Sequence, residues 1–463
     1  MTHDIRSVHF IGICGTAMAS TAAAMKEQGY LVTGSDEGVY PPMSTFLEAR
    51  GITVLSPFDP ANVPPNVDLV VVGNAMSRGN AEVELTLAGG LRYTSLPELL
   101  KEFFIRGKRS IVIAGTHGKT STTSLLTWVF EHNGLNPSYM LGGVPNNLHQ
   151  GARLTDSEWF IIEGDEYDTA FFDKRSKFVH YLPEIAIVNN LEFDHADIFD
   201  DLAAVKKSFA HFIRLVPNNG LLLANGDDPN LAGLLDVDFC PIKRFGLGDG
   251  NDLRATDIES GEQASSFLLG ETTFTIPLLG DFNVRNAVAV VAASRAAGLS
   301  DEKIQAAFSA FKGIKRRMEV LGEEGGVTVI DDFGHHPTAI RETLLALRKK
   351  YSGRRLWAIF EPRSNTTRRN VFQAELADAL GRADVAVVAE VDRLDRIPEA
   401  QRLNPEVLMT AIEDTGTRAA YLPTVDAIVG RVMDEAAEGD VVCVFSNGGF
   451  GGLHHKLLEA LAG

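Results

Sequence analysis

The sequence predicts an α/β protein of three domains with mainly parallel sheets. Short apolar runs that are typical of buried strands recur along the chain, and most lead into a polar or glycine-bearing loop and then a helix-forming segment. No internal repeat or low-complexity segment interrupts this order. The length of 463 residues suits about three domains at roughly 150 residues each. We expect a Rossmann-like domain at 1–107, a central P-loop ATPase-like domain at 108–314 and a C-terminal Rossmann-like domain at 315–463.

The overall composition excludes several classes of partner. A net charge of −18 argues against nucleic acid and against an anionic membrane surface, because there is no excess of basic side chains to displace counterions. Residues 8–13 already form a strand-like run, so the chain shows no targeting pattern there, and no run reaches the roughly 18 apolar residues of a membrane-spanning helix. The cysteines, Cys14, Cys240 and Cys443, lie far apart, as reduced thiols do. We therefore expect a cytoplasmic protein.

The first domain begins with a strand that runs into a glycine turn, Val8–Gly15. A helix-forming segment follows to Gln28, then a second strand and Asp36, an acidic residue placed to meet a ribose hydroxyl. The dinucleotide fingerprint is nevertheless broken, because Cys14 and Ala17 stand where its second and third glycines belong. The turn therefore disfavours NAD, and a nucleotide of another kind stays open as an alternative.

The remainder of this domain carries two further signals. Residues 68–72 form an apolar strand, and the polar segment Ser77–Asn80 after it reads equally well as a ligand loop or as a plain surface turn. Ser95, followed by Pro97 and Glu98, has the pattern of a helix N-cap.

The central domain opens with the motif on which the functional prediction depends most. A strand at Ile111–Ala114 leads into a glycine loop, and a helix that begins near Lys119 ends at Gly134. Backbone N–H groups of such a loop and the helix N-terminus bind phosphate, a lysine neutralises the outer phosphates, and a threonine hydroxyl can meet Mg²⁺. The strict Walker pattern fails by one residue, because Ile113 stands where its first glycine belongs, and an ordinary turn is the alternative. We expect ATP to bind at Gly115, Thr116, His117, Gly118, Lys119, Thr120 and Ser121.

Two clusters of polar residues follow later strands of this domain. Residues 159–162 lead into Glu163, Asp165, Glu166 and Asp168, whose mutual repulsion a magnesium ion would relieve, although a solvated acidic loop is the alternative. Residues 185–188 lead into a polar segment in which His195 stands among carboxylates, as a metal ligand or a base would, although a lone histidine is usually neither. Further along, Asn283 and Asn286 begin an alanine-rich helix, which one of them could cap.

The third domain repeats the pattern of strands that end in polar loops. A basic stretch at 313–317 marks the place where two domains meet. Strands at 327–330, 356–360 and 441–445 are each followed by a polar or glycine-rich loop, and we expect a site along that edge of a doubly wound sheet.

The order of these motifs resembles the ATP-dependent Mur ligases of peptidoglycan synthesis. The matching stretches span the whole chain: HFIGICGTAMA, GSD, AGTHGKTST, EGDE, NNLEFDHAD, GDFNVRNA, KRRME, DDFGHHP and the glycine-rich loop near the C-terminus. Four further stretches, VVGNAMSRGN, DEYDTAFFDKRSKFVHY, FEPRSNT and SNGGFGG, are similar to the members of the family that act in murein recycling. Gly164, Ser121 and Phe333 depart from the commoner alanine, threonine and tyrosine.

The resemblance implies an amide-forming reaction. ATP would activate the lactyl carboxylate of UDP-N-acetylmuramate as an acyl phosphate, and the amino group of L-alanyl-γ-D-glutamyl-meso-diaminopimelate would then displace phosphate. The alternative within the family is the ligase that adds free L-alanine. Two readings from other classes stay open: a nicotinamide oxidoreductase, and a nucleotide-dependent switch without ligase chemistry.

The resemblance also implies roles for individual residues. Lys119, Glu163, His195 and Arg317 would be catalytic, and Thr120, Glu163 and His195 would hold Mg²⁺, as two ions. Asn283 and Asn286 would reach the adenine, Arg317 the γ-phosphate and Asp332 the ATP ribose. The uridine nucleotide would lie at Gly12, Gly15, Thr16, Asp36 and Ser77, and the tripeptide carboxylates at Arg363 and Asn365. Some members carry a carbamylated lysine, but nothing in the sequence supports that role for Lys174 or Lys177.

Overall fold

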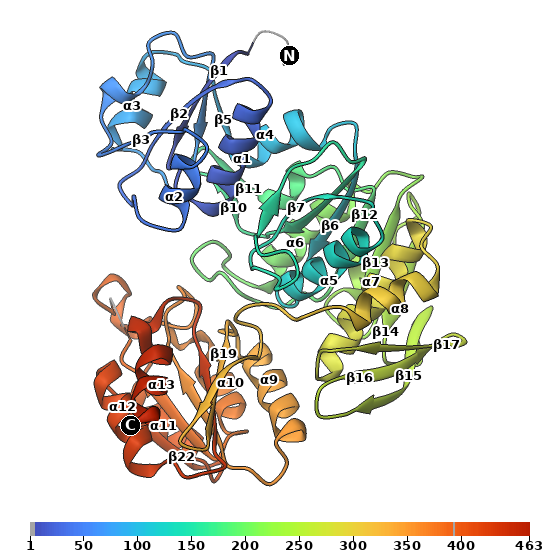
Figure 1. Cartoon of the computed structure of the whole chain (residues 1–463), viewed down its shortest axis with the longest axis vertical. Coiled ribbons are helices and arrows are strands. Elements are labelled where there is room, and N and C mark those ends of the chain that lie inside the picture. The colour runs from blue at the N-terminus through green and yellow to red at the C-terminus, as the bar shows by residue number, and fades with distance from the viewer. Residues whose placement is uncertain (1–4, 392–393) are drawn as a thin grey trace.

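The computed structural model describes residues 5–391 and 394–463, which form three lobes, each built around its own sheet. In Figure 1 the lobes run from blue through green and yellow to red, and the central lobe lies between the other two along the chain. Apolar side chains of the strands and of the facing helices form the buried core of each lobe.

The first lobe is a parallel sheet with strand order β3-β2-β1-β4-β5. The register pairs Val8 with Val32 on one side and with Leu69 on the other, so β1 is central and its C-terminal end meets those of β2 and β4. The strands are β1 (Ser7–Ile11), β2 (Leu31–Ser35), β3 (Val54–Leu55), β4 (Leu69–Val72) and β5 (Tyr93–Ser95), and the helices are α1 (Thr16–Glu27), α2 (Met43–Glu48), α3 (Ala81–Ala88) and α4 (Leu96–Leu100).

The central lobe contains a sheet of ten strands in the order β17-β16-β15-β14-β13-β12-β6-β9-β7-β8. The pairs from β15 through β9 to β7 are parallel, whereas β15–β16–β17 and β7–β8 are antiparallel. The strands are β6 (Arg109–Ala114), β7 (Ser138–Met140), β8 (Ala152–Arg153), β9 (Trp159–Gly164), β12 (Ile185–Val188), β13 (Leu221–Asn225), β14 (Ile242–Gly246), β15 (Leu253–Ser260), β16 (Ser265–Leu269) and β17 (Thr272–Ile276). The helices are α5 (Lys119–His132), α6 (Leu202–Ile213), α7 (Asp281–Ala296) and α8 (Asp301–Ser309).

A separate antiparallel hairpin, β10 (Asp168–Ala170) with β11 (Asp173–Ser176), follows β9 and continues into the short helix η3 (Lys177–His180). The helix η3 contacts α4 of the first lobe and α6 of the central lobe. The hairpin segment therefore lies where these two lobes meet.

The third lobe is a six-stranded sheet in the order β18-β19-β23-β20-β21-β22, parallel except for the edge strand β18. Its strands are β18 (Glu319–Glu324), β19 (Val327–Asp332), β20 (Leu356–Phe360), β21 (Val385–Ala389), β22 (Arg418–Leu422) and β23 (Val441–Phe445). Its helices are α9 (Pro337–Lys350), α10 (Gln373–Leu380), α11 (Pro405–Glu413), α12 (Val425–Glu435) and α13 (Leu453–Ala462).

The α/β class and the mainly parallel sheets are confirmed, with two corrections of detail. Glu163 is the fifth residue of β9, and Asp332 is the last residue of β19. Both therefore belong to strands rather than to loops, and the strand backbone fixes the position of each carboxylate. The interpretation of an asparagine cap on α7 is wrong: Gly280 occupies the N-cap with φ +91°, and both asparagines are buried inside the helix. Among the described residues no helix is long and apolar enough to cross a membrane, and all three cysteines are free.

Candidate active site

Two cavities lie beside the central lobe. The larger, of about 990 Å³, lies between the central and third lobes, and the smaller, of about 560 Å³, lies between the first and central lobes. Both volumes suit small-molecule ligands. The predicted residues divide between them: His117, Gly118, Ser121, Asn283, Asn286, Arg317 and Asp332 line the larger cavity, and Gly12, Gly15, Thr16, Asp36 and Glu163 line the smaller one.

The phosphate-binding loop has the backbone geometry that its glycines predict. Gly118 is the N-cap of α5 in the left-handed region at φ +75°, and a Cβ there would lie 2.9 Å from the side-chain oxygen of Asn286. Gly115, at φ +147°, packs equally closely against Asn189. The loop therefore needs glycine at both positions, and it leaves the first N–H groups of α5 free to bind an anion.

Lys119 and His195 share one buried carboxylate, that of Glu166. The ammonium of Lys119 donates to Glu166 Oε2 at 2.7 Å and to the Gly115 carbonyl at 2.7 Å, and His195 Nε2 lies 3.3 Å from Glu166 Oε1. Glu166 is only 2% exposed. The sequence placed it in the acidic cluster but assigned it no role, so it is a site residue that sequence reasoning missed.

The charges of this triad stabilise one another. Burial favours neutral Glu166, but Lys119 and His195 outweigh it and lower the pKa of that carboxyl to about 2. Burial likewise works against protonated His195, while the hydrogen bond and charge of Glu166 raise its pKa above the ordinary value. The backbone of His195 is also strained, because its φ of +53° lies in the left-handed region. The surrounding contacts therefore hold this residue in an otherwise unfavourable backbone conformation.

A second chain of contacts joins Arg317 to Glu163 through Thr120. The Arg317 guanidinium donates to the Thr120 hydroxyl at 3.2 Å, and that hydroxyl donates to Glu163 Oε2 at 3.1 Å. Glu163 also accepts the Gly142 N–H at 2.6 Å. Arg317 comes from the linker before the third lobe and lies with its guanidinium 5.0 Å from the ring centre of Phe333.

The residues at Thr120 and Glu163 fit a hard cation. Burial and the nearby Asp165 charge raise the pKa of Glu163 to about 7, which is the penalty expected for carboxylates gathered without enough positive charge. The hydroxyl and carboxylate oxygens are ligands that Mg²⁺ prefers. The imidazole of His195 instead lies 3.3 Å from Oε1 of Glu166.

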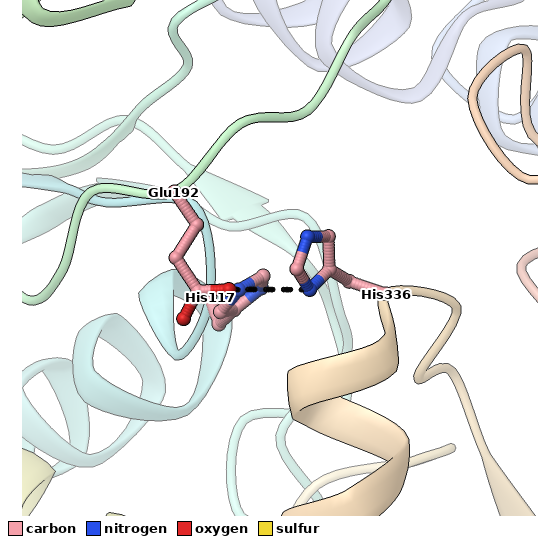
Figure 2. A group of neighbouring side chains, drawn as sticks. All are labelled: His117, Glu192 and His336. Atoms are coloured by element: carbon pink, nitrogen blue, oxygen red, sulfur yellow. Dashed lines mark ion pairs between the residues drawn. The ribbon is translucent and has the colours of Figure 1, made fainter. Parts of the chain in front are cut away.

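The side chain of His117 forms part of the contact between the central and third lobes (Figure 2). Its ring lies 4.2 Å from that of His336, and its Nε2 lies 3.4 Å from Glu192 Oε2. Glu192 in turn accepts the hydroxyl of Thr338, at the start of α9, at 2.6 Å. Both nitrogens of His336 already have hydrogen-bond partners, the Thr338 N–H and the Phe193 carbonyl. Burial lowers the pKa of His336 to about 3, so its ring is neutral at pH 7 and joins the two lobes through these hydrogen bonds.

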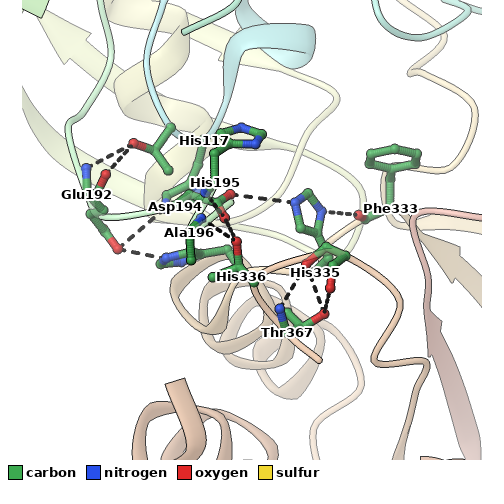
Figure 3. Close-up of polar contacts among 12 residues, drawn as sticks. His117, Glu192, Asp194, His195, Ala196, Phe333, His335, His336 and Thr367 are labelled. Atoms are coloured by element: carbon green, nitrogen blue, oxygen red, sulfur yellow. Dashed lines mark hydrogen bonds and ion pairs between the residues drawn. The ribbon is translucent and has the colours of Figure 1, made fainter. Parts of the chain in front are cut away.

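Asp194 is the centre of a second set of interlobe contacts (Figure 3). Its Oδ1 accepts the His195 N–H and the Thr366 hydroxyl, each at 2.7 Å, and the same hydroxyl accepts the Ala196 N–H at 3.3 Å. Asn365 donates to Asp197 at 2.7 Å. The loop predicted to bind peptide is therefore bonded directly to the segment that carries His195.

The smaller cavity begins at the glycine turn of the first lobe. Asp36 accepts the N–H groups of Cys14 at 2.8 Å and of Gly38 at 2.9 Å, and so holds the turn after β1. The N-cap of α1 is Gly15, so no side chain caps the first N–H groups of this helix. Ser77 lies outside the residues that line this cavity, and Asn80 caps α3, which favours the surface-turn interpretation of that segment.

The remaining predicted residues are placed as follows. Asn283 donates to the Leu279 carbonyl, and Asn286 lies against the phosphate loop. Asp332 is buried and accepts backbone N–H groups from Met318 and Gly334. Arg363 is half exposed, 3.5 Å from Glu361, and packs over Gly448, where a Cβ would meet its guanidinium.

Three family models match consecutive parts of the chain. They are the Mur ligase family, catalytic domain at residues 7–108, the Mur ligase middle domain at 113–294 and the Mur ligase, glutamate ligase domain at 316–448.

The individual relatives match over the full length. A UDP-N-acetylmuramate–L-alanyl-γ-D-glutamyl-meso-2,6-diaminoheptandioate ligase from Haemophilus influenzae is 44% identical over 99% of both chains, and the Escherichia coli ligase of the same name is 42% identical over 98% of both. The crystal structure of a murein peptide ligase from Psychrobacter arcticus matches with a TM-score of 0.73 at 39% identity over 99% of both chains. A UDP-N-acetylmuramate–L-alanine ligase from Variovorax paradoxus is less similar, at 31% identity over 100% of this chain and 96% of its own.

Proposed function

Since this chain belongs to the Mur ligase family, we propose that it joins UDP-N-acetylmuramate to L-alanyl-γ-D-glutamyl-meso-diaminopimelate with consumption of ATP. The observation that carries the proposal is the full-length similarity to ligases named for this reaction, 44% and 42% identity against 31% for a ligase named for free L-alanine. The product is a nucleotide-linked muramoyl tripeptide, so the reaction belongs to cytoplasmic peptidoglycan recycling.

The reaction has two steps. A lactyl carboxylate oxygen attacks the γ-phosphorus of ATP, which releases ADP and gives an acyl phosphate. The amino group of the tripeptide then attacks the acyl carbon, loses a proton and expels inorganic phosphate. Two anions meet in the first step, so catalysis depends on positive charge placed where negative charge develops.

The ATP phosphates would lie on the glycine loop and the N-terminus of α5, with Lys119 and Arg317 as cationic partners. Lys119 would exchange Glu166 for phosphate, since both are anions and only 2.7 Å separates the ammonium from the carboxylate. Arg317 would reach the γ-phosphate from its position beside Thr120. Asn283 and Asn286 would serve the adenine, and Asp332 the ribose, in the larger cavity.

Magnesium would be held by Thr120 and Glu163, with His195 serving a second ion. When bound, the metal would neutralise phosphate charge and withdraw electrons from the phosphorus under attack. The uridine nucleotide would occupy the smaller cavity, at Gly12, Gly15, Thr16 and Asp36. The tripeptide would meet Arg363 and Asn365.

Phosphate release tests the proposal directly. We expect release from ATP, Mg²⁺ and UDP-N-acetylmuramate when the tripeptide is added, and little release when free L-alanine replaces it. Turnover with L-alanine and none with the tripeptide would still show ligase chemistry, but of the enzyme that adds free L-alanine. No turnover with either amine would contradict the proposal.

A further inference from the structure

The smaller cavity has a marked imbalance of charge. Of the described residues that line it, the ionisable carboxylates are Asp36, Glu163 and Asp165, and one side chain, Lys177, is cationic. The proposed occupant is itself anionic, with a pyrophosphate and a carboxylate. An anion that enters a cavity lined by carboxylates needs a positive partner, and Lys177 is the side chain that can supply it.

Lys177 is built into the wall of the cavity rather than displayed on the surface. It is the first residue of η3, its backbone N–H bonds to the Tyr167 carbonyl at 3.2 Å, and its side chain is only 17% exposed. Its ammonium lies 4.0 Å from the ring centre of Tyr167 and 3.6 Å from Asp165 Oδ2. This last separation is longer than a hydrogen bond, so the ammonium keeps donor capacity for a ligand.

The position of Lys177 along the cavity indicates which anion it meets. The glycine turn and Asp36, at the ends of β1 and β2, line the end that suits the nucleotide. Lys177, like Glu163 and Tyr167, lines the cavity from the central lobe. The ring of Tyr167 lies 5.4 Å from the ring of His195. The lysine therefore lies on the central-lobe side of the cavity, with the Tyr167 ring between it and His195.

We propose that Lys177 binds the lactyl carboxylate of the muramate substrate and so distinguishes it from a UDP-sugar without that group. This inference rests on the proposed function and adds a substrate-binding residue to it. Burial lowers the pKa of Lys177 while the Asp165 charge opposes that effect, and a carboxylate bound beside the ammonium would favour its charged form further.

The same hairpin segment offers a matched control. Lys174, three positions earlier, has a side chain that is 70% exposed, pairs with Asp168 and does not line the cavity. Replacing either lysine by methionine removes the same charge from the same segment, so only the variant in the cavity wall should alter substrate binding.

The test is calorimetric binding of UDP-N-acetylmuramate and of UDP-N-acetylglucosamine to the full chain, with Mg²⁺ and a saturating non-hydrolysable ATP analogue. We expect wild type to prefer the muramate, and Lys177→Met to weaken muramate binding by about tenfold or more without changing the affinity for UDP-N-acetylglucosamine. Lys177→Arg should keep the preference, and Lys174→Met should match wild type.

Other outcomes would overturn the proposal in recognisable ways. An equal loss of affinity for both nucleotides in Lys177→Met would mean that the lysine binds the shared UDP moiety or stabilises the fold. Unchanged affinity for both would mean that it does neither. If Lys177→Met is unstable, Lys177→Gln takes its place. An unchanged affinity for the ATP analogue shows that the variant used is folded. Failure of wild type to bind either nucleotide would instead contradict the proposed function itself.

Discussion

A single buried carboxylate, Glu166, connects the lysine of the phosphate loop to His195. Lys119 and His195 contact different oxygens of it, at 2.7 Å and 3.3 Å. This arrangement holds two cationic groups close together before ATP arrives, because an anion between them offsets their repulsion.

Replacing Glu166 by glutamine should lower the pKa of His195, because Glu166 is what raises it above its ordinary value against the effect of burial. We expect the loss of this charged partner to raise the activation barrier by about 1–3 kcal/mol, which lowers kcat by about 5- to 150-fold. An NMR titration of the His195 ring measures the pKa. Asp168→Asn removes a nearby carboxylate that pairs with exposed Lys174 and should leave that pKa in place. An unchanged His195 pKa in the Glu166 variant would contradict this account.

Charge reversal at Arg363 tests the proposed peptide contact. Arginine binds carboxylates with paired hydrogen bonds, and Arg363 is half exposed beside the glycine-rich loop. Arg363→Glu should raise the KM for the tripeptide by about tenfold or more while the KM for ATP stays constant. Steady-state kinetics measure both, with exposed Arg382→Glu as the control. Unchanged tripeptide kinetics would remove Arg363 from the peptide site.

At the scale of elements, helix α3 joins three other parts of the first lobe through Glu82. This fully buried carboxylate receives the Asn62 amide at 2.8 Å, the Asp59 N–H at 3.1 Å and the hydroxyl of Ser35, and His9 Nε2 lies 3.4 Å away. Burial raises its pKa, but these hydrogen bonds outweigh burial and leave the pKa below the ordinary value of 4.5.

The stability of the first lobe should therefore decrease as the pH is lowered. A carboxyl whose pKa is lowered in the folded state contributes stability above the unfolded pKa near 4.5, and loses that contribution as pH falls through the folded pKa. Glu82→Gln should cost about 1–3 kcal/mol at pH 7, and its difference from wild type should shrink below pH 4.5. Scanning calorimetry at both pH values measures this. Exposed Glu48→Gln is the control, and a difference independent of pH would refute the assignment.

At the scale of the whole molecule, contacts between the central and third lobes fix their arrangement around the larger cavity. Thr366 contributes two of them, to Asp194 at 2.7 Å and to the N–H of Ala196 at 3.3 Å. The linker before the third lobe also has unusual backbone geometry, since Arg316 and Met318 are left-handed at φ +60° and +49°.

Thr366→Val should loosen this arrangement, because it leaves a buried carboxylate oxygen and an N–H short of a partner at about 1–3 kcal/mol. We expect a broader distribution of distances between fluorophores placed on the central and third lobes. Thr367→Val, which loses side-chain hydrogen bonds only to Ser364 of its own loop, should leave the distribution unchanged. A Thr366→Val distribution identical to wild type would show that these contacts do not hold the lobes.

Local features of the fold were predictable, whereas contacts across space were not. The strands at 185–188, 356–360 and 441–445 follow the predicted bounds, because short apolar runs bounded by polar loops define buried parallel strands. The antiparallel extension β15–β16–β17 and the hairpin β10–β11 carry no comparable signal, since their exposed faces are polar.

The same distinction holds for the candidate site. Lys119, Thr120 and Glu163 could be proposed from the sequence, because strand ends and glycine loops are typical of phosphate and metal sites. Glu166 and Thr366 could not, because their importance depends on partners 29 or more positions away that only the folded lobes bring together: Glu166 meets Lys119 and His195, and Thr366 meets Asp194.

The hydroxyl–carboxylate contact between Thr120 and Glu163, 3.1 Å long, has a consequence for substrate choice. Glu163 lines the smaller cavity while neighbours of Thr120 in the glycine loop line the larger one, so this contact lies between the two cavities. If the sugar nucleotide binds at the glycine turn of the first lobe, as we propose, it must extend along the smaller cavity for its reactive end to reach Glu163. We therefore expect a UDP-sugar that lacks the lactyl group to bind without reaching the ATP phosphates.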